Sequence, residues 1–452
     1  MKSNPWVASY LVSNAPDRYS QLERRAVVLR IKGDSVIARS EVLRDAMSDI
    51  FLCGEQISLL LDKLLAIAEG HALNHYDSSK QVLESLYSLR PWGETRQPAI
   101  MLTGLAGTGK TQLLLAMKRF FCDRVGSVEL PRHGNLEILP AWFMSLKDGN
   151  TLNALIGPCV DPESADKLDE TENSRKKDLK QSQLLKLASR VSRRDGVCII
   201  FLDEFQFISR SLHANALAIS LLLQMISIGP RVVYVANFSL ARRLMNRRQE
   251  DRQRVLGNPL ELRPDDLHSS DFRNYFSELI KVSPEDFKFD VAAMAELIHR
   301  YTYGIKRALV ELIVGAWVHA KSRRGDKADV TESDVRAAYA SSGYLTYRTD
   351  VEALWRYSVG DKNIDQDLLN PFSVESATSN IVIVEKAINS FNQRINERHV
   401  ESMLTPFERD AFSKLAPPAG SATLGGTVRP LRKGAGSKEA LLSAFERVAK
   451  DL

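Results

Sequence analysis

Residues Gly104-Leu105-Ala106-Gly107-Thr108-Gly109-Lys110-Thr111 match the pattern G-x-x-x-x-G-K-[ST]. In this pattern backbone N–H groups surround nucleotide phosphates, the lysine reaches the β- and γ-phosphates, and the threonine hydroxyl binds Mg²⁺. An apolar run, 99–102, precedes the motif, and a helix-like segment, 112–117, follows it and adds the positive end of its dipole. The sequence therefore predicts an ATP and Mg²⁺ site. Its expected nucleotide-binding residues are Gly104, Leu105, Ala106, Gly107, Thr108, Gly109, Lys110, Thr111 and Gln112.

The overall composition is that of an ordinary globular protein with room for two to four domains, since the 452 residues are 44% hydrophobic and 26% charged. A net charge of +5 is too small to predict a nucleic-acid partner by itself. The four cysteines are too far apart for a zinc knuckle or a C-x-x-C pair, which favours reduced thiols. No apolar run has the length of a membrane span, and the N-terminus lacks a signal-peptide core. We expect a cytoplasmic protein with no membrane contact.

Apolar strand-like runs alternate with helical segments over residues 96–265, which is typical of a parallel sheet wrapped by helices. One run, 138–146, contains Pro140, and proline fits best at the start of a strand or at a sheet edge. The segment 166–178 is highly charged and predicts an exposed loop or a solvated helix. We expect an α/β P-loop ATPase core over 96–265.

A fully apolar run, 197–202, ends in Asp203 and Glu204. In an open parallel sheet, the carboxyl end of such a strand lies beside the phosphate loop. Asp203 is then expected to hold Mg²⁺ together with Thr111, and Glu204 is expected to polarise the attacking water as general base. A buried strand followed by an acidic turn is the alternative.

A further apolar strand, 231–236, ends in Asn237. In ATPases of the AAA+ type a residue at this place senses the γ-phosphate, although a strand-end asparagine also forms turns. The next segment is crowded with arginines: Arg242, Arg243, Arg247, Arg248, Arg252 and Arg254. A guanidinium supplied by a neighbouring subunit stabilises the transferring phosphoryl group, and Arg247, Arg248 and Arg252 are the candidates. DNA phosphate contacts and a solvated basic helix remain as alternatives.

Residues 266–345 have helical periodicity throughout and predict a small all-helical lid. A capping-box spacing at 331–334 begins the last of its four helices. Behind a P-loop core, Arg307 is expected to reach back to the nucleotide. Plain surface charges at Lys306 and Arg307 are the alternative.

The ends of the chain are less informative. Residues 1–95 form an extension that either recognises a partner or packs on the core. Within it, His71 and His75 are interpreted as surface histidines, because no third metal ligand accompanies them. Residues 346–415 predict a C-terminal helical region, and 416–452 predict a flexible linker with a terminal amphipathic helix that docks on a partner, frays or packs back on the lid.

The segment 201–210, Phe-Leu-Asp-Glu-Phe-Gln-Phe-Ile-Ser-Arg, resembles the "DEIQHLSR"-like stretch of the TnsC/TniB family of AAA+ ATPases, which regulate target choice in DNA transposons. The order of the other parts is also similar over residues 1–345, from an Asn-Pro-aromatic opening through GLAGTGKT to a lid with Gly-x-x-Arg. Phe207 departs from the family, which commonly has histidine or another polar residue there.

The resemblance implies ATP-dependent assembly into a ring or helical filament on double-stranded DNA. It also implies recruitment by a target-selection protein and contact with transposase subunits. Family members contact the DNA backbone from the turn after the second strand, where this chain has Lys147. The alternatives are a helicase-loader or replication-initiator ATPase, and a signalling or defence scaffold that uses ATP as a switch.

Overall fold

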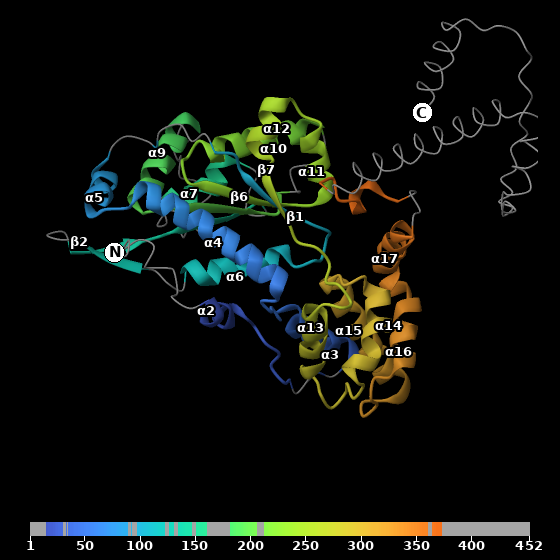
Figure 1. Ribbon diagram of the computed structural model, residues 1–452. Helices are drawn as coiled ribbons and strands as arrows, with labels where there is room; N and C mark the ends of the chain where they lie inside the picture. The colour runs from blue at the N-terminus through green and yellow to red at the C-terminus, as the bar shows by residue number, and fades with distance from the viewer. Residues whose placement is uncertain are drawn as a thin grey trace, which may run out of the picture. The chain divides into compact units, whose positions relative to one another are not determined.

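In the computed structural model, the apolar run before the phosphate loop forms one strand of a five-stranded sheet with the order β4-β5-β6-β1-β7. Figure 1 labels β6, β1 and β7 of this sheet. All four strand pairs are parallel, so the carboxyl ends of the strands lie at the same edge. The predicted α/β fold is therefore confirmed. The strands are β1 (Ile100–Thr103), β4 (Ala141–Ser145), β5 (Ile199–Asp203), β6 (Arg231–Ala236) and β7 (Gly257–Glu261).

The structure describes residues 15–29, 33, 35–88, 92, 97–122, 126–130, 134–146, 151–160, 181–205, 212–359 and 364–372. Several expectations fall outside these ranges: the role of Lys147, the charged segment 166–178, the residues 206–210 that carry part of the family resemblance, and the segments predicted beyond residue 372. The described helices include none that is long and apolar enough to cross a membrane.

Helices cover both faces of the sheet because successive residues of a strand point to opposite sides. Ile100 and Leu102 pack on one face with α4 and α6, whereas Met101 packs on the other face. The helices of the first face are α4 (Glu55–His75) and α6 (Lys110–Cys122). Those of the second face are α7 (Leu152–Val160), α9 (Gln181–Arg194), α10 (Leu212–Ile226), α11 (Phe238–Met245) and α12 (Gln249–Val255).

An antiparallel hairpin lies between α6 and β4 and was not expected from the sequence. It pairs β2 (Gly126–Leu130) with β3 (Gly134–Ile138). The run 138–146 is thus divided, because Ile138 ends the hairpin and β4 begins at Ala141. Pro140 lies just before β4, which is an edge strand, so the expectation for this proline is confirmed.

The lid is all-helical, as predicted, and has its own hydrophobic core around Phe272, Phe276 and Trp317. The predicted capping box is confirmed, since the Thr331 side chain accepts from the Asp334 backbone N–H and the Asp334 carboxylate accepts from the Thr331 backbone N–H at 2.8 Å. The four helices of the predicted lid are α13 (Ser270–Lys281), α14 (Val291–Thr302), α15 (Lys306–Arg324) and α16 (Glu332–Ala340). Helix α17 (Leu345–Ser358) lies in the predicted C-terminal helical region, and its Leu354 packs in the lid core.

The N-terminal region packs in two places. Helix α3 (Val36–Ser48) lies against α15, where Leu43 and Met47 enter the lid core and Arg44 forms an ion pair with Glu311. Helix α4 lies on the sheet instead, and the two short helices of the region are α2 (Ala15–Leu22) and α5 (Ser79–Tyr87).

The expectation of two surface histidines is wrong for His71. Helix α4 buries one side against the sheet, and His71 lies on that side, only 7% exposed and 5.2 Å from the Trp92 ring between centroids. Burial lowers the pKa of His71 to about 3, so this ring is neutral. Among the described residues there is no cluster of three or more potential metal ligands.

Candidate nucleotide site

A cavity of about 460 Å³ opens between the phosphate loop, the sheet edge, the lid and an N-terminal segment. Most of the predicted nucleotide and catalytic residues line it, and they come from separate parts of the chain. The lining residues are Ser48, Ile50, Phe51, Leu52, Ile57, Ala106, Gly107, Gly109, Lys110, Thr111, Gln112, Asp203, Glu204, Val235, Asn237, Tyr275, Lys306, Arg307, Val310 and Glu311.

The phosphate loop requires glycine at two close approaches. Gly107 has a φ of 83°, and a Cβ atom there would lie 2.8 Å from the Arg307 Cβ atom. Gly104 lies against Leu262, the first residue after β7, and an added Cβ atom would be 2.2 Å from the Leu262 carbonyl oxygen. A side chain at Gly107 would force the loop away from the lid, and one at Gly104 would force it away from Leu262.

Lys110 is buried at the start of α6, and its Nζ donates to the carbonyl oxygens of Gly104 at 2.9 Å and Leu105 at 2.7 Å. Burial, together with the nearby Arg307, lowers the pKa of Lys110 to about 7, and Asp203 and Glu204 oppose this shift. The ammonium therefore lies in a desolvated position where an anionic phosphate would stabilise its charge.

The two acids follow β5 as the sequence predicted, and both line the cavity opposite the phosphate loop. Glu204 has a left-handed backbone with φ of 58°, and its N–H donates to Asp203 Oδ1 at 2.8 Å. This turn brings the Glu204 side chain to the same cavity as Asp203. Asn237, at the end of the neighbouring strand β6, also reaches the cavity.

A magnesium ion would find suitable ligands here. Hard divalent cations prefer oxygen ligands, and Mg²⁺ is usually held by one or two protein oxygens together with water and phosphate. Thr111 and Asp203, which carry a hydroxyl and a carboxylate, are among the residues that line the cavity. The donor set therefore fits the ion that the sequence predicted.

The lid contributes two cations from the first turn of α15. The Arg307 backbone N–H donates to the Gly107 carbonyl oxygen at 3.1 Å, which joins the lid to the phosphate loop. The Lys306 side chain is 17% exposed, so the alternative of a plain surface charge does not hold for it. Arg307 is exposed, and it too lines the cavity.

One wall of the cavity was missed by the sequence analysis. The N-terminal region and the lid both contribute to this wall. Its residues are Ser48, Ile50, Phe51, Leu52 and Ile57 of the N-terminal region and Tyr275, Val310 and Glu311 of the lid. The Gln112 side-chain amide donates to the Ser48 carbonyl oxygen at 3.0 Å and ties this wall to α6. No local pattern in residues 48–52 signals a ligand site, because the wall forms only when α3 and α4 are packed.

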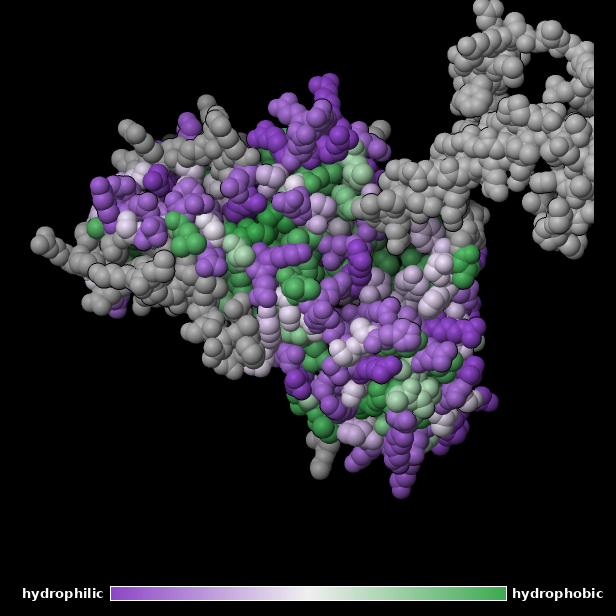
Figure 2. Space-filling model, in the orientation of Figure 1, coloured by the Kyte–Doolittle hydropathy of each residue, from purple (hydrophilic) through white to green (hydrophobic). Residues whose placement is uncertain are grey.

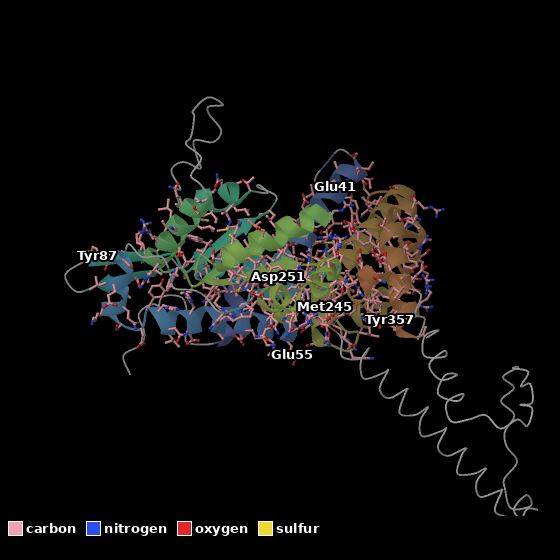
Figure 3. All side chains as sticks on the ribbon, turned by 90° about the horizontal axis from the view of Figure 1, so that it is seen from above. Glu41, Glu55, Tyr87, Met245, Asp251 and Tyr357 are labelled. Atoms are coloured by element: carbon pink, nitrogen blue, oxygen red, sulfur yellow. The ribbon has the colours of Figure 1, made fainter. Side chains whose placement is uncertain are left out.

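The six arginines of residues 242–254, which lie in α11, in α12 and between them, do not line this cavity, and they include the finger candidates Arg247, Arg248 and Arg252. Arg242 Nη2 donates to the carbonyl oxygens of Gln366 and Leu369, so it holds the segment after the lid against α11. Arg252 Nη1 donates to the Met245 carbonyl oxygen at 3.2 Å, and Arg248 is exposed. Figure 2 shows a hydrophilic surface over α12, and Figure 3 labels Met245 and Asp251 in this segment.

Comparison with known proteins identifies an AAA domain over residues 93–244, the part that holds the phosphate loop, the acid pair and Asn237. This part is therefore a P-loop ATPase core of the AAA+ fold, and the all-helical lid follows it in the chain. A search of proteins with established function finds no significant match.

Several solved structures are similar at low identity. The ORC1 protein of Aeropyrum pernix in complex with DNA is 20% identical, with 67% of this chain and 68% of that chain covered and a TM-score of 0.41. The ORC2 protein of the same organism is 15% identical, with 60% and 67% covered and a TM-score of 0.39. Domain III of the Thermotoga maritima replication initiation protein DnaA is 14% identical, with 57% and 88% covered and a TM-score of 0.32.

Proposed function

We propose that this protein is an ATP-hydrolysing AAA+ regulator of DNA transposition that assembles on target DNA and links target selection to the transposase. The observation that carries the ATPase part is the meeting of Lys110, Asp203 and Glu204 in one cavity within an AAA domain. The resemblance of the segment that begins at Asp203 to the TnsC/TniB family supports the transposition part.

The reaction would follow from the positions of these side chains. The phosphate loop would bind the β- and γ-phosphates, and Thr111 and Asp203 would hold Mg²⁺, which would supply positive charge beside the phosphates. Glu204 orients and polarises the attacking water, and Asn237 and Arg307 contact the γ-phosphate. All of these residues line the cavity, which supports the proposed roles.

Assembly would complete the site. Because the described arginines of residues 242–254 lie outside the cavity of their own chain, we propose that Arg247, Arg248 or Arg252 enters the cavity of a second copy. Such a head-to-tail interface closes into a ring or continues as a helical filament. ATP would then favour the assembled state, and hydrolysis would favour release.

DNA would be bound through its backbone. Lys147, which the family resemblance indicates for this contact, would supply affinity without sequence discrimination. The choice of target would then depend on the target-selection protein, and the assembled ATPase would present that target to the transposase subunits.

Electron microscopy of the protein with duplex DNA and a non-hydrolysable ATP analogue tests the proposal. We expect rings or filaments that enclose the duplex, and their absence would contradict it. Loading of a hexameric helicase by the same sample would favour a replication role instead. Assemblies that form without DNA and turn over no ATP would favour a signalling or defence scaffold.

The Glu204→Gln variant tests the assignment of the general base. It keeps the size of the side chain but removes the carboxylate that polarises water, so we expect ATP-bound assemblies on DNA that persist long after those of the wild type have dissociated. Light scattering after removal of free ATP measures this lifetime. Equal lifetimes for variant and wild type would exclude Glu204 as the base.

A further inference from the structure

Lys306 is the second lid cation that lines the cavity, and its ammonium group lies beside a carboxylate without a hydrogen bond to it. Its Nζ lies 3.7 Å from Asp265 Oδ2 and 5.3 Å from the centroid of the Tyr275 ring. The distance of 3.7 Å is longer than a hydrogen bond. Within the described part of the chain, Asp265 Oδ2 is buried and has no hydrogen-bond partner. The pair therefore leaves the N–H donors of Lys306 available to a ligand.

Asp265 is fixed to the turn that carries Lys306. Its backbone N–H donates to the Gly304 carbonyl oxygen at 3.1 Å, and its own carbonyl oxygen lies 3.0 Å from His299 Nε2. A Cβ atom on Gly304 would lie 1.9 Å from the same carbonyl oxygen, so Asp265 and this turn are in close contact. The Asp265 backbone is thus fixed to the turn that precedes Lys306 and Arg307, and its carboxylate lies beside the Lys306 ammonium without a hydrogen bond to it.

The stem of Lys306 runs beside the phosphate loop. A Cβ atom added to Gly109 would lie 3.7 Å from the Lys306 Cδ atom. Loops of this type surround the α- and β-phosphates with backbone N–H groups, so a phosphate held next to Gly109 would be within reach of the lysine. Lys306 also lines a second cavity of about 240 Å³ beside Cys53 and Asp271, and it therefore stands where the two cavities adjoin.

We propose that Lys306 is a further nucleotide-binding residue, which contacts the α- or β-phosphate, and that Asp265 is its positioning residue. The inference rests on the proposed nucleotide site and names a contact that the sequence did not assign. The negative charge of Asp265 balances the positive charge of Lys306, which reduces the repulsion between Lys306 and the nearby Arg307. Lys306 can therefore donate a hydrogen bond to a phosphate close to Arg307. The α- and β-phosphates are common to ADP and ATP, so the contact would hold the nucleotide before and after hydrolysis.

Nucleotide affinity in Lys306 variants tests the proposal. Lys306→Met keeps the stem beside Gly109 and Tyr275 but removes the ammonium. Since a hydrogen bond to a charged group is lost, we expect both ADP and a non-hydrolysable ATP analogue to bind about tenfold more weakly. Titration calorimetry measures both affinities. Arg307→Met gives the contrast, because a γ-phosphate contact affects the ATP analogue more than ADP. Lys288→Met removes an exposed lid lysine that pairs with Asp329, and it should leave both affinities unchanged.

The double variant Asp265→Asn, Lys306→Met separates binding from folding. Lys306→Met alone leaves a buried carboxylate without a cation and should lower the unfolding temperature, whereas the double variant removes both charges and should recover it. We expect the recovered protein still to bind ADP about tenfold more weakly than the wild type. Wild-type affinity for ADP in this stable double variant would overturn the role of Lys306, and so would a loss restricted to the ATP analogue. A wild-type protein that binds neither nucleotide would instead overturn the proposed function itself.

Discussion

Arg307 and the arginines of residues 242–254 differ in where they lie relative to the nucleotide cavity. Arg307 lines the cavity, and its backbone N–H is bonded to Gly107 of the phosphate loop. The α11–α12 arginines lie outside it, and Arg242 and Arg252 donate to carbonyl oxygens of their own chain. In the proposed site, a single copy would hold a nucleotide between core and lid, whereas Arg247, Arg248 or Arg252 would reach its γ-phosphate only across an interface between copies.

The largest effect is expected from removing the finger candidates. The triple variant Arg247→Ala, Arg248→Ala, Arg252→Ala should lower ATP hydrolysis in the DNA-bound assembly by about 10³-fold, because an arginine supplied in trans stabilises the transferring phosphoryl charge. Phosphate release measures the rate, and ADP affinity should stay at the wild-type value. An equal loss of ADP affinity would place these arginines in the cavity of their own chain and remove the contrast with Arg307.

Mixing variants sharpens the same contrast. In an equal mixture, the triple arginine variant supplies an intact cavity and Glu204→Gln supplies intact finger arginines. Random assembly brings the two together at about a quarter of the interfaces, so we expect about a quarter of wild-type hydrolysis. Arg307→Ala mixed with Glu204→Gln should recover none, because both changes lie in the cavity of one copy and no complete cavity can form. Recovery in both mixtures would contradict the placement of Arg307.

Lys110→Ala tests the part of the site that lies within one copy. It removes the buried ammonium beside the phosphates, and we expect ATP and ADP affinity to fall by about 10²-fold, since charge-assisted contacts to two phosphates are lost together. Titration calorimetry on the isolated protein, without DNA, checks this. Unchanged affinity would show that the phosphate loop does not bind the nucleotide.

The smallest expected effect is a proton taken up on binding. Burial holds the pKa of Lys110 at about 7, so at about pH 8.5 this group is mostly neutral before nucleotide binds. Bound phosphates favour the ammonium and raise its pKa, and the protein should take up about one proton per ADP at this pH. ADP affinity should correspondingly fall as pH rises above 7. Calorimetry in two buffers of different ionisation enthalpy measures the uptake, and zero uptake would contradict the low pKa.

The fold of the core was predictable because its signals are local. Apolar strands ending in Asp203 and Asn237 indicated a parallel sheet, and parallel strands must end at one edge. The glycines of the phosphate loop and the periodicity of the lid helices are also properties of short segments. For the same reason the capping box at Thr331 was visible in four consecutive residues.

The other parts of the site have no such local signal. Ser48 and Phe51 reach the cavity because α3 packs on the lid and α4 packs on the sheet, and these two packing arrangements involve residues far away in the chain. His71 looked like a surface residue for the same reason, since its burial depends on Trp92 and on the sheet beneath α4. The hairpin β2–β3 was missed because its short strands carry only a weak alternation.

The residue types and spacings of this chain are thus enough to predict a nucleotide-binding α/β core, its acid pair and a helical lid, because each depends on hydrogen bonding and periodicity within one segment. The chain packing determines which cations lie beside the phosphate loop: it brings Arg307 and Lys306 there and leaves the arginines of residues 242–254 outside the cavity. Charges act through space, so the partners of a charged group depend on contacts between segments that are distant in the sequence.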